Sequence, residues 1–210
     1  RDELTLGIVS EPADERNMAF LQADYDDPAR ETEQWMYFPA LKKLKRIVSE
    51  SPNRPKTGSV FGSEVAYEDN ERLQLDDYDF VLLGEAEMDG RACDLLEATP
   101  RAHRQARSSY NRQLFWVDRV SRAPLKRELY DRRSGELSKT FVVKELRQEG
   151  EAWVATVEIA VNHQSRRMTL LKTESMAVNQ TMSTALFDQR ALGDAAFRES
   201  LLVPLRSAAR

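Results

Sequence analysis

Hydrophobic and polar residues alternate with a period of two along most of this chain of 210 residues. The alternation begins with Leu4, Leu6 and Ile8. Further runs lie near 18–23, 35–38, 78–86, 91–99, 112–119, 124–131, 138–147, 151–162 and 165–177. A period of two is typical of β-strands, whereas a helix would repeat every 3.6 residues or so. Turn signals separate the runs, and Asp89-Gly90 is a good hairpin signal. We therefore expect a meander of about ten antiparallel strands.

Three segments break this pattern. Residues 49–62 are rich in Ser, Pro, Gly and Lys, which predicts a mobile loop. Residues 63–73 predict a short helix that begins at Ser63, because Glu64 in the first turn would suit the helix dipole. Residues 182–203 predict one or two short helices, with apolar contacts from Met182 and Leu186.

Several of the expected strands are apolar on both faces. Phe80 and Leu82 oppose Val81 and Leu83, and the run 114–117 shows the same pattern. An antiparallel sheet with one solvated face would not have such strands. Either protein covers both faces, as in a packed sandwich or a helix-filled concavity, or the sheet curls around something apolar, as in small ligand-holding barrels. The pattern alone leaves these alternatives open.

Composition and charge limit the class of protein. Hydrophobic residues make up 41% and charged residues 31% of the chain, which indicates a globular protein with a sizeable core. The length favours a single domain over residues 1–210. The net charge of −4 gives no overall attraction to nucleic acid. A basic cluster formed by Lys42, Lys43, Lys45 and Arg46 suits either an anionic surface or a solvated strand edge protected by lysine.

Candidate chemistry is sparse. Cys93 is the one cysteine, and neither His103 nor His163 has neighbours at the spacing of a metal site. There is no nucleophile elbow, P-loop or dinucleotide fingerprint, and no run of about 20 apolar residues. Carboxylates are dense around Glu68 and Asp69, and we expect that high local charge to keep them solvated. We therefore expect neither an enzyme nor a cofactor or metal site.

Several motifs, in order, resemble one family. The segment 35–47, WMYFPALKKLKRI, looks like the W-x-Y-x-P-A-L-x-x-x-R-R-I signature of the LolA-like outer-membrane lipoprotein-sorting proteins. The segment 61–69, FGSEVAYED, resembles their F-x-G-S-D-F-S-Y-E-D segment, although Glu64 replaces the usual Asp. The match continues through Leu83-Gly84, the Cys93 strand, 97–100, 114–118, 124–131 and Leu186-Phe187.

The resemblance implies a mainly β fold with short helices. The expected sheet is antiparallel and strongly curved, an unclosed half-barrel whose concave face is covered by helices. The family's N-terminal helix and strand are expected to be absent from this chain. The resemblance also implies a periplasmic carrier that binds the acyl chains of a lipoprotein or another lipid, with transient membrane contact, and moves them toward the outer membrane.

Two other functions compete with the carrier. An accessory subunit with the same fold would dock a resistance-nodulation-division (RND) type lipid exporter in the inner membrane without carrying lipid. An enzyme acting on lipids would need a polar pair inside the pocket, for instance two carboxylates within hydrogen-bond reach.

A lipid tail costs about 0.8 kcal/mol for each methylene exposed to water, so a carrier needs an apolar pocket. One face of each central strand supplies the expected lining: Met18, Phe20, Trp35, Tyr37, Phe80, Leu82, Leu114, Trp116, Trp153 and Val157. The expected lid or partner contacts are Lys42, Lys43, Lys45, Arg46 and Phe61.

Overall fold

A computed structural model describes residues 2–27, 29–51 and 53–208 of the chain. Contacts between Cα atoms divide the chain into two compact units. The first unit joins Arg1–Val48 to Ser175–Arg210, and the second unit is Ser49–Glu174. Each unit is described by itself.

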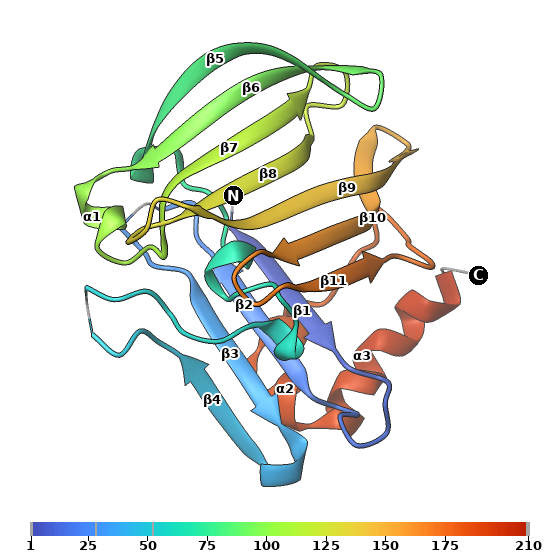
Figure 1. Cartoon of the computed structure of the whole chain (residues 1–210). Helices are drawn as coiled ribbons and strands as arrows, with labels where there is room; N and C mark the ends of the chain where they lie inside the picture. Colours follow the sequence, from blue (N-terminus) through green and yellow to red (C-terminus); the bar gives the residue numbers. More distant parts are fainter. Residues whose placement is uncertain (1, 28, 52, 209–210) are drawn as a thin grey trace. The chain divides into compact units, whose positions relative to one another are not determined.

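The first unit contains a four-stranded antiparallel sheet in the order β1-β2-β3-β4 (Figure 1). Its strands are β1 (Glu3–Ile8), β2 (Ala19–Asp24), β3 (Glu33–Phe38) and β4 (Lys43–Ile47). Pro39 opens the one-turn 3₁₀ helix η1 (Pro39–Leu41) between β3 and β4, where its fixed φ suits the first helical position. Pro39 therefore marks the change of direction between β3 and β4.

The C-terminal segment of the first unit is helical, as predicted. It comprises η5 (Thr184–Phe187), α2 (Gln189–Gly193) and α3 (Ala195–Ala208), and α2 packs against β2 and β3. The buried side chains of Ala19, Leu21 and Leu192 form a core between the sheet and these helices. The fully buried Arg198 of α3 donates to the carbonyl oxygens of Ala191 and Leu192, and this ties α3 to α2.

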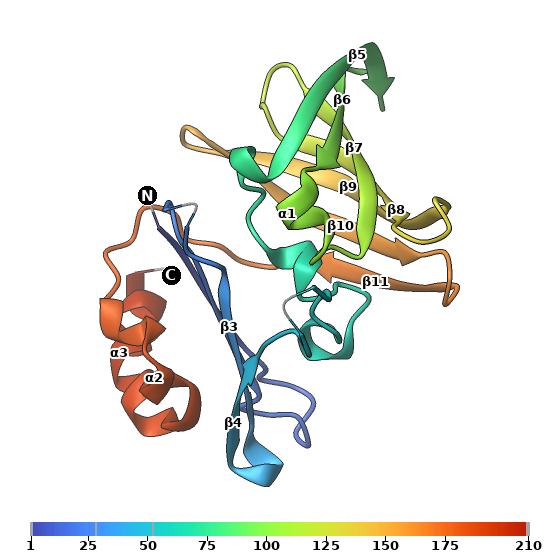
Figure 2. The same ribbon diagram turned by 90° about the vertical axis from the view of Figure 1, so that its left-hand side faces the viewer.

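The second unit contains a seven-stranded antiparallel sheet in the order β11-β10-β9-β8-β7-β6-β5 (Figures 1 and 2). Its strands are β5 (Tyr78–Met88), β6 (Arg91–Pro100), β7 (Tyr110–Asp118), β8 (Pro124–Asp131), β9 (Leu137–Glu149), β10 (Ala152–Asn162) and β11 (Arg167–Lys172). The short helix α1 (Ala102–Gln105) connects β6 to β7. Asp89 and Gly90 both have positive φ, which confirms the predicted hairpin turn.

The large sheet is strongly curved but not closed. The guanidinium of Arg91 on β6 lies 5.5 Å from the ring of Trp153 on β10, although three strands separate β6 from β10. Four strand spacings in a flat sheet would span about 19 Å, so the sheet must bend to bring these side chains together. The predicted fold class, a mainly β unclosed half-barrel with short helices, is confirmed.

The segment that leads into β5 differs from the prediction. A helix over 63–73 was expected, but the structure has only short 3₁₀ turns, η2 (Val60–Gly62), η3 (Glu68–Asn70) and η4 (Leu75–Asp77). Ser63 ends η2 instead of beginning a helix. The reason is that Ser59 and Ala66 form a β-bridge, and the Asp69 carboxylate accepts the Ala66 N–H at 2.7 Å. These contacts hold the backbone extended where a helix would have to start.

Candidate functional site: an apolar groove in the first unit

A groove of about 400 Å³ opens beside the four-stranded sheet. Its apolar wall is formed by Leu4 of β1, Leu21 and Ala23 of β2, Trp35 of β3 and Phe187 of η5. Alternation along β2 and β3 explains this wall, because Leu21 pairs with Trp35 across the ladder and both side chains therefore point to the same face. The volume falls in the range of sites that bind small molecules, about 300–1,000 Å³.

Polar side chains complete the lining. Tyr25, Glu33, Asp188 and Gln189 contribute to the groove. Burial and the nearby Glu33 carboxylate raise the pKa of the Tyr25 hydroxyl, so Tyr25 stays protonated at neutral pH. Its hydroxyl is engaged by a hydrogen bond to the Glu33 side chain. An apolar wall with a few polar groups suits an amphipathic ligand.

Cations lie close to the aromatic side chains of this groove. The Arg46 guanidinium lies 5.6 Å from the centre of the Trp35 ring and pairs with Glu33 at 3.1 Å. The Arg30 guanidinium lies 3.2 Å from the centre of the Tyr25 ring. Cations over aromatic faces are attracted by the ring quadrupole, so these contacts help to orient both rings.

The four lining residues predicted for the first unit do not share one face. Trp35 and Tyr37 face α2 and the groove side of the sheet, where Ala19 and Leu21 are their cross-strand partners. Phe20 pairs with Met36, and alternation places both on the opposite face, where they are almost fully buried. Met18 precedes β2 and is half-buried. The register that the sequence left open is thus resolved, and Trp35 is the one of these four that lines the groove.

The predicted residues of the second unit divide between two faces of the large sheet. Cross-strand pairing places Leu82 with Leu96 and Phe115 on one face. Leu114 and Trp116 alternate with Phe115 and therefore lie on the other face. Phe80 shares the face of Leu82, and Trp153 and Val157 are half-buried residues of β10. A lining role for these six residues stays a prediction.

The predicted lid or partner contacts belong to two separate segments of the chain. Lys43, Lys45 and Arg46 are exposed residues of β4, an edge strand of the four-stranded sheet, and Lys42 directly precedes it. Phe61 is a half-buried residue of η2 in the second unit, with φ +51°. Their proposed role in contacts also stays a prediction.

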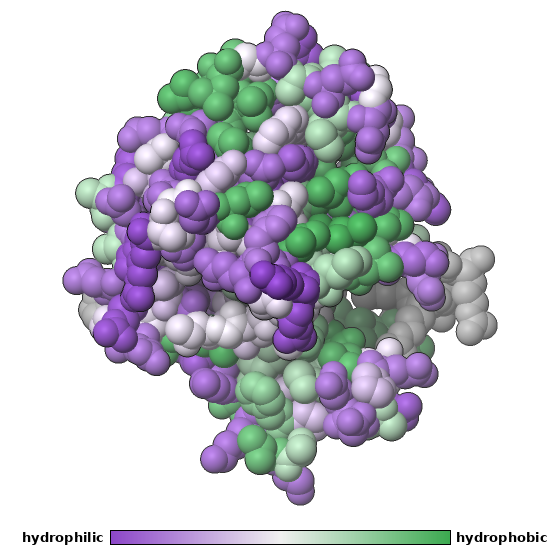
Figure 3. All heavy atoms as spheres, viewed as in Figure 1, coloured by the Kyte–Doolittle hydropathy of each residue, from purple (hydrophilic) through white to green (hydrophobic). Residues whose placement is uncertain are grey.

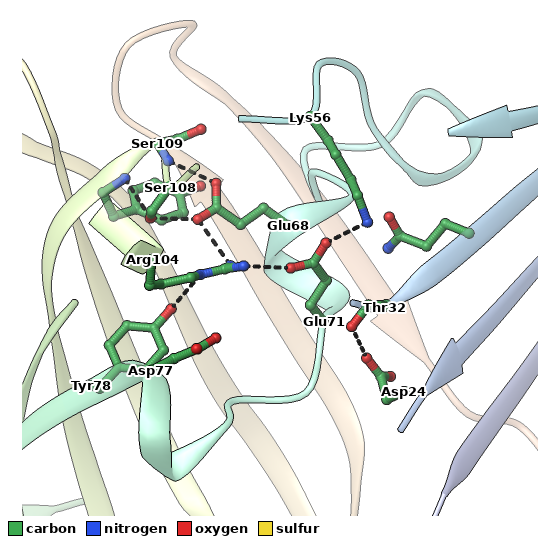
Figure 4. A network of polar contacts seen from close by, with 12 residues as sticks. Asp24, Thr32, Lys56, Glu68, Glu71, Asp77, Tyr78, Arg104, Ser108 and Ser109 are labelled. Atoms are coloured by element: carbon green, nitrogen blue, oxygen red, sulfur yellow. Dashed lines mark hydrogen bonds and ion pairs between the residues drawn. The ribbon is translucent and has the colours of Figure 1, made fainter. Parts of the chain in front are cut away.

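The expectation of solvated carboxylates at 68–71 was wrong. Glu68 and Asp69 are buried, and the Glu71 side chain is only 9% exposed. The Arg104 guanidinium bridges Glu68 and Glu71, with N–O distances of 3.3 and 3.0 Å (Figure 4). High local charge in the sequence did not imply solvation, because cations from distant positions neutralise these carboxylates.

Further contacts complete this charged network. Lys56 pairs with Glu71 at 2.7 Å, and the Ser109 N–H donates to Glu68 at 2.8 Å (Figure 4). Burial raises the pKa of the Glu68 carboxyl, and the Arg104 charge and the Ser108 hydroxyl oppose this shift. Asp69 pairs with Lys139 of β9 and accepts from the Tyr110 hydroxyl of β7. The network therefore fastens residues 56–71 onto the large sheet.

Glu68 and Glu71 are two neighbouring carboxylates of the kind that an enzyme acting on lipids would require. The sequence alone does not indicate that Arg104 and Lys56 pair with them. Acid–base catalysis needs a carboxyl group that can reach a substrate. Here Arg104, Lys56 and two serines occupy the carboxylate oxygens.

Among residues 2–27, 29–51 and 53–208, no group of three His, Cys, Asp or Glu side chains could hold a metal ion. No helix in these described residues is long and apolar enough to span a membrane.

An open, strongly curved antiparallel sheet with short helices defines the class of unclosed half-barrels. Comparison with solved structures identifies the same class. A Vibrio parahaemolyticus domain described as an outer membrane lipoprotein-sorting protein is 32% identical, with a TM-score of 0.78, over 90% of this chain and 76% of that one. A DUF1329 family protein from Desulfovibrio piger is 26% identical, with a TM-score of 0.82, over 91% of this chain and 78% of that one.

A LolA superfamily protein from Nitrosomonas europaea is 22% identical over 90% of this chain and 78% of that one. Its TM-score of 0.63 supports the fold alone. A family model described as "Uncharacterized protein" matches residues 1–194. A comparison with curated proteins finds no match. The chain belongs to the LolA-like family of outer-membrane lipoprotein-sorting proteins.

Proposed function

We propose that the protein is a periplasmic carrier that binds acyl chains of a lipoprotein or another lipid in the groove of the first unit and delivers them toward the outer membrane. The observation that carries this proposal is the apolar wall formed by Leu4, Leu21, Trp35 and Phe187. Support also comes from the Vibrio parahaemolyticus relative, which is described as a lipoprotein-sorting protein.

The energetics of a carrier fit such a groove. Each methylene withdrawn from water contributes about 0.8 kcal/mol, so a buried stretch of ten methylenes contributes about 8 kcal/mol before the costs of binding are subtracted. A carrier must also release its cargo. An open groove of about 400 Å³ suits both binding and release, because it shelters part of an acyl chain without enclosing the whole lipid.

The polar lining suggests how a cargo would be oriented. Asp188 and Gln189 supply an acceptor and an amide at the beginning of α2. A lipid whose chain contacts Trp35 and Phe187 would place its ester or amide groups among these side chains. This chemistry needs no cofactor and no catalytic residue, so we propose no enzymatic activity.

Native mass spectrometry of protein purified from its own cell envelope tests the proposal. We expect a bound lipid on the wild-type protein and its loss in Ala23→Phe, because the added ring fills the groove. Ala155→Phe, at an exposed position of β10, is the matched control and should keep the lipid. Absence of lipid from the wild-type protein, or equal retention in both variants, would contradict the proposal.

The second candidate is an accessory subunit that docks an RND-type lipid exporter. The exposed basic strand β4 favours it, because Lys43 and Lys45 are exposed and lie on the same face of the strand, which suits an acidic partner. This candidate predicts that replacing both lysines with serine abolishes lipid export in cells while lipid binding by the purified protein is unchanged. Loss of both would favour the carrier.

A further inference from the structure

A polar pocket of about 460 Å³ opens in the second unit, where residues 53–57 meet the turn between β8 and β9. Its lining includes three arginines, Arg54, Arg132 and Arg133, and the hydroxyl groups of Thr57 and Ser109. Figure 3 shows strongly hydrophilic side chains at the left, over this turn. The volume falls in the range of small-molecule sites, about 300–1,000 Å³.

Arg132 is held in place by backbone groups and not by a carboxylate. Its backbone N–H donates to the carbonyl oxygen of Ser109 at 2.8 Å. Its Nη1 donates to the carbonyl oxygens of Gln105 and Ala106 at 2.8 and 2.9 Å. Among the residues that the structure describes, its Nε and Nη2 groups have no hydrogen-bond partner. These two groups are the parallel donors with which arginine binds a carboxylate or a phosphate, so the side chain is fixed with this edge unused.

The other two arginines are also able to meet an anion. Arg133 is exposed, and within residues 2–27, 29–51 and 53–208 its guanidinium has no ion-pair partner. Arg54 pairs with Glu50 at 3.3 Å, and both side chains are 68% exposed. Such an exposed pair is weak, so Arg54 can turn to a bound anion at little cost.

Asp131 is the second carboxylate of the lining, and it is engaged within its own turn. Its Oδ1 accepts the backbone N–H groups of Arg133 and Ser134, both at 2.9 Å. These N–H groups hold the pKa of the Asp131 carboxyl below its ordinary value, so Asp131 stays ionised at neutral pH. The lining thus carries three guanidinium groups against two carboxylates, and both carboxylates already have donors.

The donors suit a tetrahedral oxyanion. The guanidinium groups come from two segments, 53–57 and 131–133, and the hydroxyl groups of Thr57 and Ser109 add further donors. Donors from several directions match the three or four oxygens of a phosphate, whereas a carboxylate presents only two. The groove of the first unit differs in charge, because none of the described residues that line it is a lysine or an arginine.

We infer that this arginine pocket binds the phosphate group of a phosphate ester, either a soluble ester or the headgroup of a phospholipid. The Nε–Nη2 edge of Arg132 binds two phosphate oxygens. Arg133 and Arg54 neutralise the remaining charge. Binding here does not depend on the acyl groove of the first unit.

Isothermal titration calorimetry of the 210-residue protein tests this inference with two probes, sn-glycerol 3-phosphate and vesicles of phosphatidylglycerol. Saturable binding of glycerol 3-phosphate would support a soluble ester as the ligand. Binding of the vesicles alone would support a lipid headgroup. Absence of binding to both probes would overturn the inference.

Matched variants locate the binding. Arg133→Glu reverses a charge in the pocket and should raise the Kd about tenfold. Arg122→Glu makes the same change in the turn between β7 and β8, at the other end of β8, and should change the Kd less than about twofold. Arg132→Lys keeps the charge but loses the parallel donors, so it should raise the Kd about fivefold.

Equal weakening by Arg133→Glu and Arg122→Glu would overturn the inference, because it would reflect net charge and not the pocket. Unchanged binding in both Arg133→Glu and Arg132→Lys would overturn it as well. Ala23→Phe, which fills the acyl groove, should leave the Kd of glycerol 3-phosphate unchanged, and this separates the two sites.

Discussion

The groove of the first unit and the charged network of the second unit arise from two neighbouring sequence motifs but differ in chemistry. The segment 35–47 supplies Trp35, which lines an open apolar groove. The segment 61–69 supplies Glu68 and Asp69, which are buried and engaged by Arg104, Ser108, Lys139 and Tyr110. One motif thus leaves a surface available to a ligand, while the other satisfies its polar groups within the protein.

This difference shows how to separate binding from structural roles in a family signature. A residue available for binding has a face that other parts of its unit do not occupy, as Trp35 does in the groove. A structural residue has its hydrogen-bonding capacity used internally, as Asp69 does through Ala66, Tyr110 and Lys139. Substitutions in the network should therefore affect folding, and substitutions in the groove should affect lipid binding.

The largest effect is expected for Asp69→Ala. This change leaves the Lys139 ammonium, whose side chain is 11% exposed, without its carboxylate. Removing one partner of a buried ion pair costs about 3–5 kcal/mol of unfolding free energy. Urea unfolding measures this loss of unfolding free energy, and the exposed ion pair between Asp79 and Arg101 supplies the control. Asp79→Ala should cost less than about 1 kcal/mol. Similar losses in both variants would show that Asp69 has no special structural role.

A smaller effect is expected for Asp118→Asn, also in the second unit. The Asp118 side chain is 1% exposed and accepts from Arg91 at 2.8 and 3.1 Å. We expect a loss of about 2 kcal/mol at pH 7, typical of hydrogen bonds to charged groups.

The same variant should alter the acid dependence of stability. The Arg91 guanidinium and the Ser121 hydroxyl hold the pKa of Asp118 well below its ordinary value of 3.8. The ionised carboxylate therefore stabilises the fold above pH 3.8, and this contribution is lost as the pH falls toward the folded-state pKa. Urea unfolding between pH 6 and pH 2 should show a weaker acid dependence in Asp118→Asn than in the wild type. Equal slopes would contradict the role assigned to Asp118.

In the groove, Phe187→Ala should weaken binding of palmitic acid about tenfold, because it removes part of the apolar wall. Isothermal titration calorimetry of delipidated protein measures this change. Phe80→Ala removes the same ring from the β5 edge and should change the Kd less than about twofold. A larger loss in Phe80→Ala would move the acyl site to the second unit and would favour the predicted lining residues there.

The smallest effect is expected for Arg46→Met. Its ion pair with Glu33 is solvent-exposed, with side-chain exposures of 51 and 39%, so unfolding free energy should change by less than about 0.5 kcal/mol. Thermal unfolding monitored by circular dichroism gives this value. A loss above 1 kcal/mol would show that the contact with Trp35 stabilises the first unit more than an exposed pair does.

The sequence predicted the strands well because their signal is local. Alternation and turn residues such as Asp89-Gly90 located nearly all of the eleven strands. The helix expected at Ser63 failed for the opposite reason. Its capping residues were present, but the Ser59–Ala66 bridge and the Asp69 side chain impose an extended backbone on this segment.

The site was only partly predictable. Trp35 was identified from its motif, but Leu4, Leu21 and Phe187 are brought to it by strand register and by a return of the chain from residue 175 onward. Phe20 and Trp35 were grouped together because alternation within each strand does not say which faces coincide. The pairing of Phe20 with Met36 settles this point. The burial of Glu68 and Asp69 was not predicted, because their partners Arg104 and Lys139 are distant in sequence.

The most direct test of the central claim uses the three tryptophans as position markers. Three variants each keep a single tryptophan, at Trp35, Trp116 or Trp153, with phenylalanine at the other two positions. Each is titrated with a fatty acid brominated in mid-chain, whose bromines quench only nearby indole rings. We expect saturable quenching of Trp35 and little quenching of Trp116 and Trp153. Quenching confined to Trp116 or Trp153, or quenching of none, would contradict an acyl site in the groove of the first unit.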